Sequence, residues 1–77
     1  MNKEIFLEKL EKNGINKKMV CFDDNVSDDI FCVMTNNNYY EVYYRERGKE
    51  YYNRRFNNQD EALEYLLEYL CRIAKYI

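Results

Sequence analysis

From Asn58 onward, apolar residues recur at intervals of three and four positions. This spacing places them on one side of an α-helix, so it predicts a long amphipathic helix at the end of the chain. Asn58 followed by Glu61 has the form of a capping box, a pair of side chains that bonds the exposed N–H groups of a helix start. The predicted apolar stripe consists of Leu63, Leu66, Leu67, Leu70, Ile73, Ala74 and Ile77.

A shorter amphipathic helix is predicted near the N-terminus. Asn2 can cap it, because an asparagine oxygen accepts a hydrogen bond from a backbone N–H in the first turn. The pair Asn13-Gly14 ends the helix, and Ile15 can pack back on the last turn. The predicted helix runs through Leu10, and its apolar face consists of Phe6, Leu7 and Leu10.

The middle of the chain has the short apolar runs and polar clusters that are typical of strands and turns. Residues 19–22 and Ile30–Thr35 predict two strands. The clusters at 23–25 and 36–38 predict turns, because Asp and Asn tolerate positive φ and bond to their own backbone. Residues 39–56 then form two tyrosine-rich halves joined by a glycine, which predicts a β-hairpin.

The predicted order of elements is α-β-β-β-β-α, which indicates the α+β class. Four short strands in succession predict an antiparallel meander. Both helices can bury their apolar faces against one side of this sheet, so we expect a two-layer sandwich and a single domain over residues 1–77. The other side of the sheet is left to solvent or to a partner.

Side chains alternate between the two sides of a strand, so the hairpin divides its aromatic residues into two sets unless a bulge shifts the register. One set faces the core and the other faces outward. Exposed tyrosines in a group are typical of protein interfaces. The predicted outward set is Tyr39, Tyr43 and Tyr51, and the predicted core set is Tyr40, Val42, Tyr44, Tyr52 and Phe56.

A second group of tyrosines lies on the last predicted helix, on the side away from the leucine stripe. It consists of Tyr65, Tyr69 and Tyr76, with Glu64 and Glu68 beside it. A single such tyrosine would be ordinary, because tyrosine covers apolar neighbours while its hydroxyl stays in water. Three on one side favour a surface that contacts another molecule.

The 77-residue chain contains no histidine, so it lacks the commonest general base and the commonest metal ligand. Cys21, Cys32 and Cys71 form no close couple of the zinc or redox type, and we expect buried thiols that act as small hydrophobic groups. These features predict a protein that is not an enzyme and has no cofactor. With no apolar run long enough to span a membrane and no signal-peptide pattern, a cytoplasmic location is expected.

A metal site is not predicted in the acidic segment 23–29, although oxygen-bearing side chains stand at every second position there. A calcium loop would need glycine where Asp28 stands and glutamate where Met34 stands. These acids remain a candidate surface for a cationic partner. They are Asp23, Asp24, Asp28 and Asp29.

Nucleic acid is a weaker candidate partner. Arginine and lysine alternate with aromatic residues along 45–55, a pattern that can bind phosphates and stack bases. The net charge is −2, however, and the last predicted helix starts with the acidic run 58–61, where a double-stranded-RNA-binding domain has basic residues. Phosphates would therefore be repelled at that helix start.

The run Val42-Tyr43-Tyr44-Arg45-Glu46-Arg47-Gly48, then Phe56, Asp60-Glu61-Ala62 and Tyr65-Leu66, resembles small bacterial immunity proteins. Such proteins are encoded beside polymorphic or contact-dependent growth-inhibition toxins, which are often nucleases. The resemblance implies a cytoplasmic protein that binds one toxin domain and blocks it sterically.

The sequence thus predicts a non-catalytic toxin inhibitor. The alternatives are a small protein-interaction module, a homodimer that covers its own tyrosines, and, less favoured, an RNA-binding domain. The helix ridge combines aromatic rings with acids and is the first candidate for partner binding, and the outward tyrosines of the hairpin are the second. The candidate residues are Glu64, Tyr65, Glu68, Tyr69, Asp23, Asp24, Asp28, Asp29, Tyr39 and Tyr43.

Overall fold

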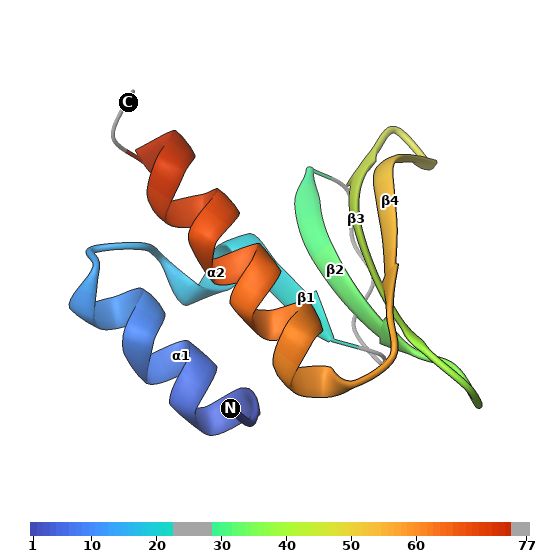
Figure 1. Cartoon of the computed structure of the whole chain (residues 1–77). Helices are drawn as coiled ribbons and strands as arrows, with labels where there is room; N and C mark the ends of the chain where they lie inside the picture. Colours follow the sequence, from blue (N-terminus) through green and yellow to red (C-terminus); the bar gives the residue numbers. More distant parts are fainter. Residues whose placement is uncertain (23–28, 75–77) are drawn as a thin grey trace.

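A computed structural model describes residues 1–22 and 29–74 of the chain (Figure 1). The predicted α-β-β-β-β-α order is confirmed, with one additional short 3-10 helix before the first strand. The elements are α1 (Lys3–Lys12), η1 (Lys17–Met19), β1 (Val20–Phe22), β2 (Ile30–Thr35), β3 (Tyr40–Glu46), β4 (Lys49–Phe56) and α2 (Gln59–Ala74).

Helix α1 begins where the sequence predicts and ends at Lys12 instead of Leu10, directly before the Asn13-Gly14 pair that was predicted to stop it. The Ile5 N–H donates to the side-chain oxygen of Asn2 at 2.9 Å, so Asn2 is the N-cap. At the other end Gly14 has φ +71°, and the Ile15 N–H donates to the Leu10 carbonyl at 2.9 Å. This is a Schellman ending, and it folds Ile15 back into the core.

The sheet is mixed, and the predicted antiparallel meander is therefore wrong for its first pair. The strand order is β1-β2-β3-β4, with β1 parallel to β2 and the two later pairs antiparallel. Parallel neighbours usually need a crossover of about a dozen residues or more. The sequence predicted a turn at 23–25 from its Asp and Asn residues, and the meander from the succession of four short strands. Residues 23–28, where that turn was predicted, lie outside the described residues.

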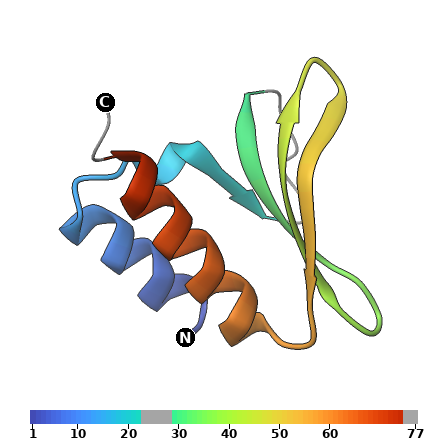
Figure 2. The same ribbon diagram turned by 45° about the horizontal axis from the view of Figure 1, so that its top comes forward.

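The two helices pack side by side against the same side of the sheet (Figures 1 and 2). Helix α1 contacts β1 through Phe6 and Phe22, whose rings meet edge to face at 6.1 Å. The leucine stripe of α2 is buried against β2 and β3, as the periodicity predicts. The most deeply buried side chains of this core are Phe6, Leu10, Val42, Ala62, Leu63, Leu66 and Leu70.

The hairpin between β3 and β4 turns at Arg47 and Gly48, both of which have positive φ (51° and 78°). Two successive residues of positive φ are what a type I′ turn requires, and this turn matches the natural twist of a hairpin. Space beside the Gly48 backbone is open, so glycine is favoured there by its backbone conformation alone. The hairpin that was predicted to turn at this glycine is confirmed.

The start of α2 provides a test of the capping prediction. The Glu61 N–H donates to the side-chain oxygen of Asn58 at 2.9 Å. We expect Asn58→Ala to lower the free energy of unfolding by about 1 kcal/mol, because this N–H would lose its partner. Asn57→Ala, an equally exposed neighbour outside the cap, is the control. Urea unfolding of both variants measures the difference, and equal stabilities would contradict the assignment.

Candidate partner-binding groove

The pairing of β3 with β4 is interrupted by a bulge. Val42 lies opposite Arg54, whereas Tyr44 lies opposite Tyr51, so β4 carries one extra residue between these two pairs. Within this irregularity Tyr52 has φ +61°, a left-handed conformation that is strained for an aromatic residue. A bulge of this kind redirects the side chains that follow it.

The bulge changes which hairpin side chains face the helices. Tyr51 lies opposite Tyr44 on the helix side, and Tyr52 is 71% exposed instead of packing in the core beside Phe56, as strict alternation predicts. Arg54 lies opposite Val42 on the helix side, and its guanidinium lies 5.8 Å from the centre of the Tyr65 ring. The extra residue accounts for two wrong assignments, that of Tyr51 to the outward side and that of Tyr52 to the core.

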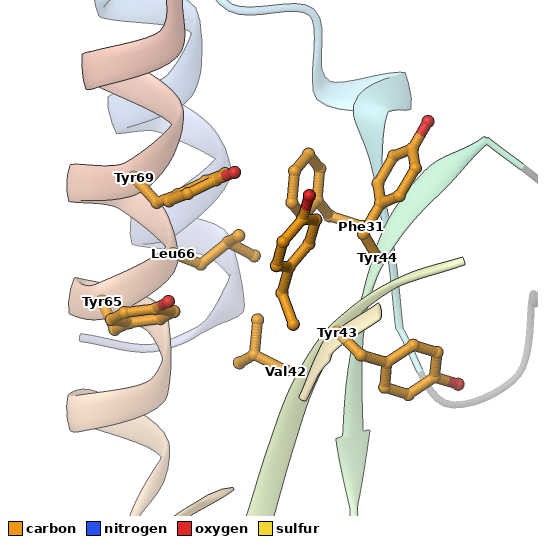
Figure 3. A pocket seen from close by; sticks show the side chains of 8 residues that line it. Phe31, Val42, Tyr43, Tyr44, Tyr65, Leu66 and Tyr69 are labelled. Atoms are coloured by element: carbon orange, nitrogen blue, oxygen red, sulfur yellow. The ribbon is translucent and has the colours of Figure 1, made fainter. Parts of the chain in front are cut away.

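A groove opens between α2 and the bulged part of the hairpin (Figure 3). It holds about 220 Å³, counting space that is open to solvent. Its enclosed part measures only about 10 Å³, room for about one water molecule, so it is a shallow aromatic depression that a partner surface can cover and not a pocket for a small molecule. Its lining comes from β2, the hairpin and α2, and consists of Phe31, Val42, Tyr43, Tyr44, Tyr52, Tyr65, Leu66 and Tyr69. We call this feature the tyrosine groove.

The helix tyrosines form one wall of the tyrosine groove. Tyr65 and Tyr69 stack on each other at 6.4 Å, and each contacts an aromatic residue of the sheet: Tyr65 meets Phe56 at 5.2 Å, and Tyr69 meets Phe31 at 5.5 Å. Both are half-buried, so the prediction that they point away from the core is wrong. The leucine stripe is narrow enough that its flanking positions also reach the sheet. Tyr76 lies outside the described residues.

Acidic groups border the groove. Glu64 and Glu68 are exposed on α2 next to Tyr65 and Tyr69, as their sequence positions predict. On the hairpin side, partial burial raises the pKa of the Tyr44 hydroxyl, and the nearby carboxylates of Asp29 and Glu46 raise it further. This hydroxyl is protonated at neutral pH and can donate a hydrogen bond to a partner.

The far side of the sheet, away from the helices, does not contain the predicted pair of exposed tyrosines. Tyr43 points away from α2 (Figure 3) but is only 4% exposed, because it packs beside Cys21 and Cys32. Tyr39 is half-buried, and the guanidinium of Arg55 lies 4.6 Å from its ring centre. Tyr43 is thus a core residue, and the buried neighbours that cover it could not be recognised from strand alternation.

Of the four acids in segment 23–29, the structure describes Asp29. Asp23, Asp24 and Asp28 lie outside the described residues, and Asp29 is exposed with φ +59°. In residues 1–22 and 29–74, no three acidic or cysteine side chains are grouped as metal ligands. Within the same residues, neither helix is long and apolar enough to cross a membrane.

Comparison with known proteins gives no assignment. No protein-family model matches the chain, and searches of curated proteins and of solved structures give no significant match.

Sequence reasoning found Tyr65 and Tyr69 but missed Tyr44 and Tyr52, which it placed in the core. One signal was present: the adjacent tyrosines at 51 and 52 break the alternation of a regular strand. Such a break is compatible with a bulge, but it does not say on which strand the extra residue lies. The bulge position is decided by the packing of Val42 and Tyr44 against the core.

The buried far-side groups predict a loss of stability at alkaline pH. Burial is the main cause that raises the pKa of Cys32 from 9.0 to about 12, and the interaction with Cys21 is the second cause. Burial is also the main cause that raises the pKa of Tyr43 from 10.0 to about 12, and the charge of Cys32 is the second cause. The folded protein keeps these protons when the unfolded chain has lost them. The free energy of unfolding must therefore fall as pH rises from about 9 to 12.

Urea unfolding at several pH values measures this effect. Tyr43→Phe removes one of the two titrating groups, so its stability should fall less steeply between pH 10 and 12 than that of the unchanged protein. Tyr39→Phe, on a half-buried tyrosine of the same hairpin, is the control. An identical pH dependence for Tyr43→Phe and the unchanged protein would contradict the burial of this hydroxyl.

Proposed function

We propose that this protein is a non-catalytic inhibitor of the immunity-protein type, which binds a toxin domain through the tyrosine groove and blocks it sterically in the cytoplasm. The observation that carries the proposal is the conformation of Tyr52. Its ring is 71% exposed at the groove, and its backbone is held at a positive φ that disfavours tyrosine.

The strain at Tyr52 is informative because the fold does not need this side chain. Gly or Asn adopts a left-handed conformation in a bulge at a lower energetic cost than tyrosine does. A bulge in the edge strand β4 also discourages pairing with other chains, but it would do so with any residue that tolerates positive φ. Strained residues gather at functional sites. An exposed tyrosine kept in this conformation therefore points to a role for its ring in binding.

The composition of the groove supports a protein partner. Tyrosine supplies a large, stiff contact area and a hydroxyl that can satisfy polar groups of a partner, and it is enriched among the residues that dominate binding energy. The acids beside the groove, Glu64 and Glu68, favour a partner with a cationic face. A nuclease cleft, which must hold phosphates, has such a face, and complementary charge would speed the encounter.

The choice of a toxin as partner rests on the resemblance to immunity proteins. The residues that carry it have different positions in this fold. Val42 is in the core, Gly48 forms the hairpin turn, and Tyr65 lines the groove. The first two support a common fold, and the third is the position through which a common mode of binding would act.

A homodimer that covers the groove is the competing use of the same surface. It would bury Tyr52 and Tyr51, which are the most exposed large aromatic residues among those described. Sedimentation of the isolated protein separates the two cases, because an inhibitor with a free groove remains a monomer at micromolar concentration. A tight dimer that Tyr52→Gly dissociates would favour the second case.

The inhibitor proposal predicts which substitutions abolish protection. The probe is the product of the neighbouring reading frame, co-expressed with this chain in a sensitive strain. We expect the unchanged chain to restore growth and to form a complex on gel filtration. Tyr52→Gly and Tyr69→Ala should each weaken binding by about 2 kcal/mol or more, because each removes an aromatic ring from the groove.

Tyr39→Ala is the matched control, because it removes a hairpin ring on the far side of the sheet. It should leave binding within about 0.5 kcal/mol, provided that circular dichroism shows an intact fold. Absence of both growth rescue and complex formation with the unchanged chain would end the toxin proposal. Loss of binding with Tyr39→Ala alone would move the interface to the far side of the sheet.

The strain argument makes a separate prediction about stability. Because a left-handed conformation costs most residues about 1–2 kcal/mol, Tyr52→Gly should unfold at an equal or higher temperature than the unchanged protein, despite the loss of a large side chain. Tyr51→Gly, which has no positive φ to relieve, should lower the melting temperature. A large drop for Tyr52→Gly would show that the ring serves the fold.

A further inference from the structure

Two cysteines face each other across neighbouring strands on the far side of the sheet. Cys21 of β1 lies directly opposite Cys32 of β2 in the parallel register, and their sulfur atoms are 2.7 Å apart. Cys21 is 5% exposed and Cys32 is completely buried. Tyr43 packs on the same cluster, and Ile30 and Met34 flank it.

This arrangement meets the geometric conditions for a disulfide bond. Neighbouring strands lie about 4.8 Å apart, which is within the window of about 4.4–6.8 Å between the Cα atoms of bonded cysteines. The side chains of Cys21 and Cys32 already point toward each other, so their sulfur atoms need to approach only from 2.7 Å to a bonding distance of about 2.05 Å. No strand has to shift register for the bond to form.

We infer that Cys21 and Cys32 form an oxidisable pair, which hydrogen peroxide converts to an intrachain disulfide that fastens β1 to β2. The strand β1 has three residues and lies at the edge of the sheet, so it has one strand neighbour to hold it. The bond adds a covalent link at the centre of this pairing. This inference stands on the cysteine geometry and is independent of the proposed function.

The reaction proceeds in two steps. The thiolate of Cys21, the more accessible sulfur, attacks one oxygen of hydrogen peroxide, and the O–O bond breaks to give a sulfenic acid and hydroxide, which takes up a proton to become water. The sulfur of Cys32 then attacks the sulfenic sulfur. The S–O bond breaks, the hydroxide accepts the Cys32 proton and leaves as water, and the two sulfurs are joined.

Two thiols and one peroxide thus give one disulfide and two waters, and the two electrons lost by sulfur reduce the peroxide. Burial raises the pKa of the Cys32 thiol to about 12, so this sulfur is not the first to react with peroxide and takes the second step, as the group that attacks the sulfenic acid. The reaction at Cys21 needs a small oxidant, because its sulfur is nearly enclosed.

The third cysteine, Cys71, serves as an internal reference. It lies on α2, is partly exposed and packs against the main core. Access alone would make it the first thiol to react, but it has no cysteine opposite it. Its oxidation should give single-site products or links between two chains, and Cys71→Ser removes both.

The test is peroxide treatment of the Cys71→Ser protein, followed by unfolding and alkylation of the remaining thiols. No Lys or Arg lies between Lys18 and Arg45, so trypsin releases both cysteines in one peptide. A second protease that cleaves before aspartate cuts this peptide between Cys21 and Cys32. The two cysteines then fall on separate fragments unless a disulfide joins the fragments. We expect the two fragments to remain joined, with neither cysteine alkylated. Their mass should be two hydrogen atoms lower than the sum of the two reduced fragments, and a reductant should separate them.

The oxidised protein should also melt roughly 10 °C higher than the reduced protein, because the bond restricts the unfolded chain. Cys32→Ser is the control: peroxide should leave a sulfenic acid at Cys21 that dimedone traps, with no rise in melting temperature. The same treatment of the unchanged protein does not depend on whether a variant folds. Two results there would overturn the inference: oxidation confined to Cys71, or full recovery of Cys21 and Cys32 as alkylated thiols.

Discussion

The packing of a single leucine stripe against the sheet is the constraint on which the rest of this structure depends. In a domain of this size there is room for one main core, and Leu63, Leu66 and Leu70 of α2 are each at most 1% exposed within it. Their burial fixes the rotation of α2 about its own axis. Tyr65 and Tyr69 are therefore held at the boundary between core and surface, where they contact the sheet and still line the groove.

The second contribution to the groove comes from a local irregularity in the hairpin. With the extra residue in β4, Tyr51 is brought to the helix side and Tyr52 is turned outward. Without the extra residue, the register that starts at the turn would pair Tyr52 with Tyr43 on the far side of the sheet, away from the groove. One aromatic surface is thus formed by α2, which is oriented by the burial of its leucines, and by β4, which is distorted although tyrosine disfavours positive φ. This surface is the basis of the proposed inhibition.

Local signals in the sequence were sufficient for the helices and for most strands. Gly14 marks a helix end through its positive φ, Asn58 marks a helix start through its side-chain oxygen, and Ile30–Thr35 forms a strand with the predicted bounds. The direction of β1 and the bulge at Tyr52 were not predicted, because both depend on contacts between distant segments. The same reason explains Tyr43, whose burial comes from the cysteines of β1 and β2 rather than from its own strand.

The central claim is that the tyrosine groove is the surface that a partner covers. Amide hydrogen exchange, measured with and without the product of the neighbouring reading frame, tests it without any substitution. The account predicts that binding slows exchange in β4 around Tyr52 and in the outer residues of α2 near Tyr65 and Tyr69, and leaves α1 unchanged. Protection confined to α1 or β1, with no change around Tyr52, would contradict it.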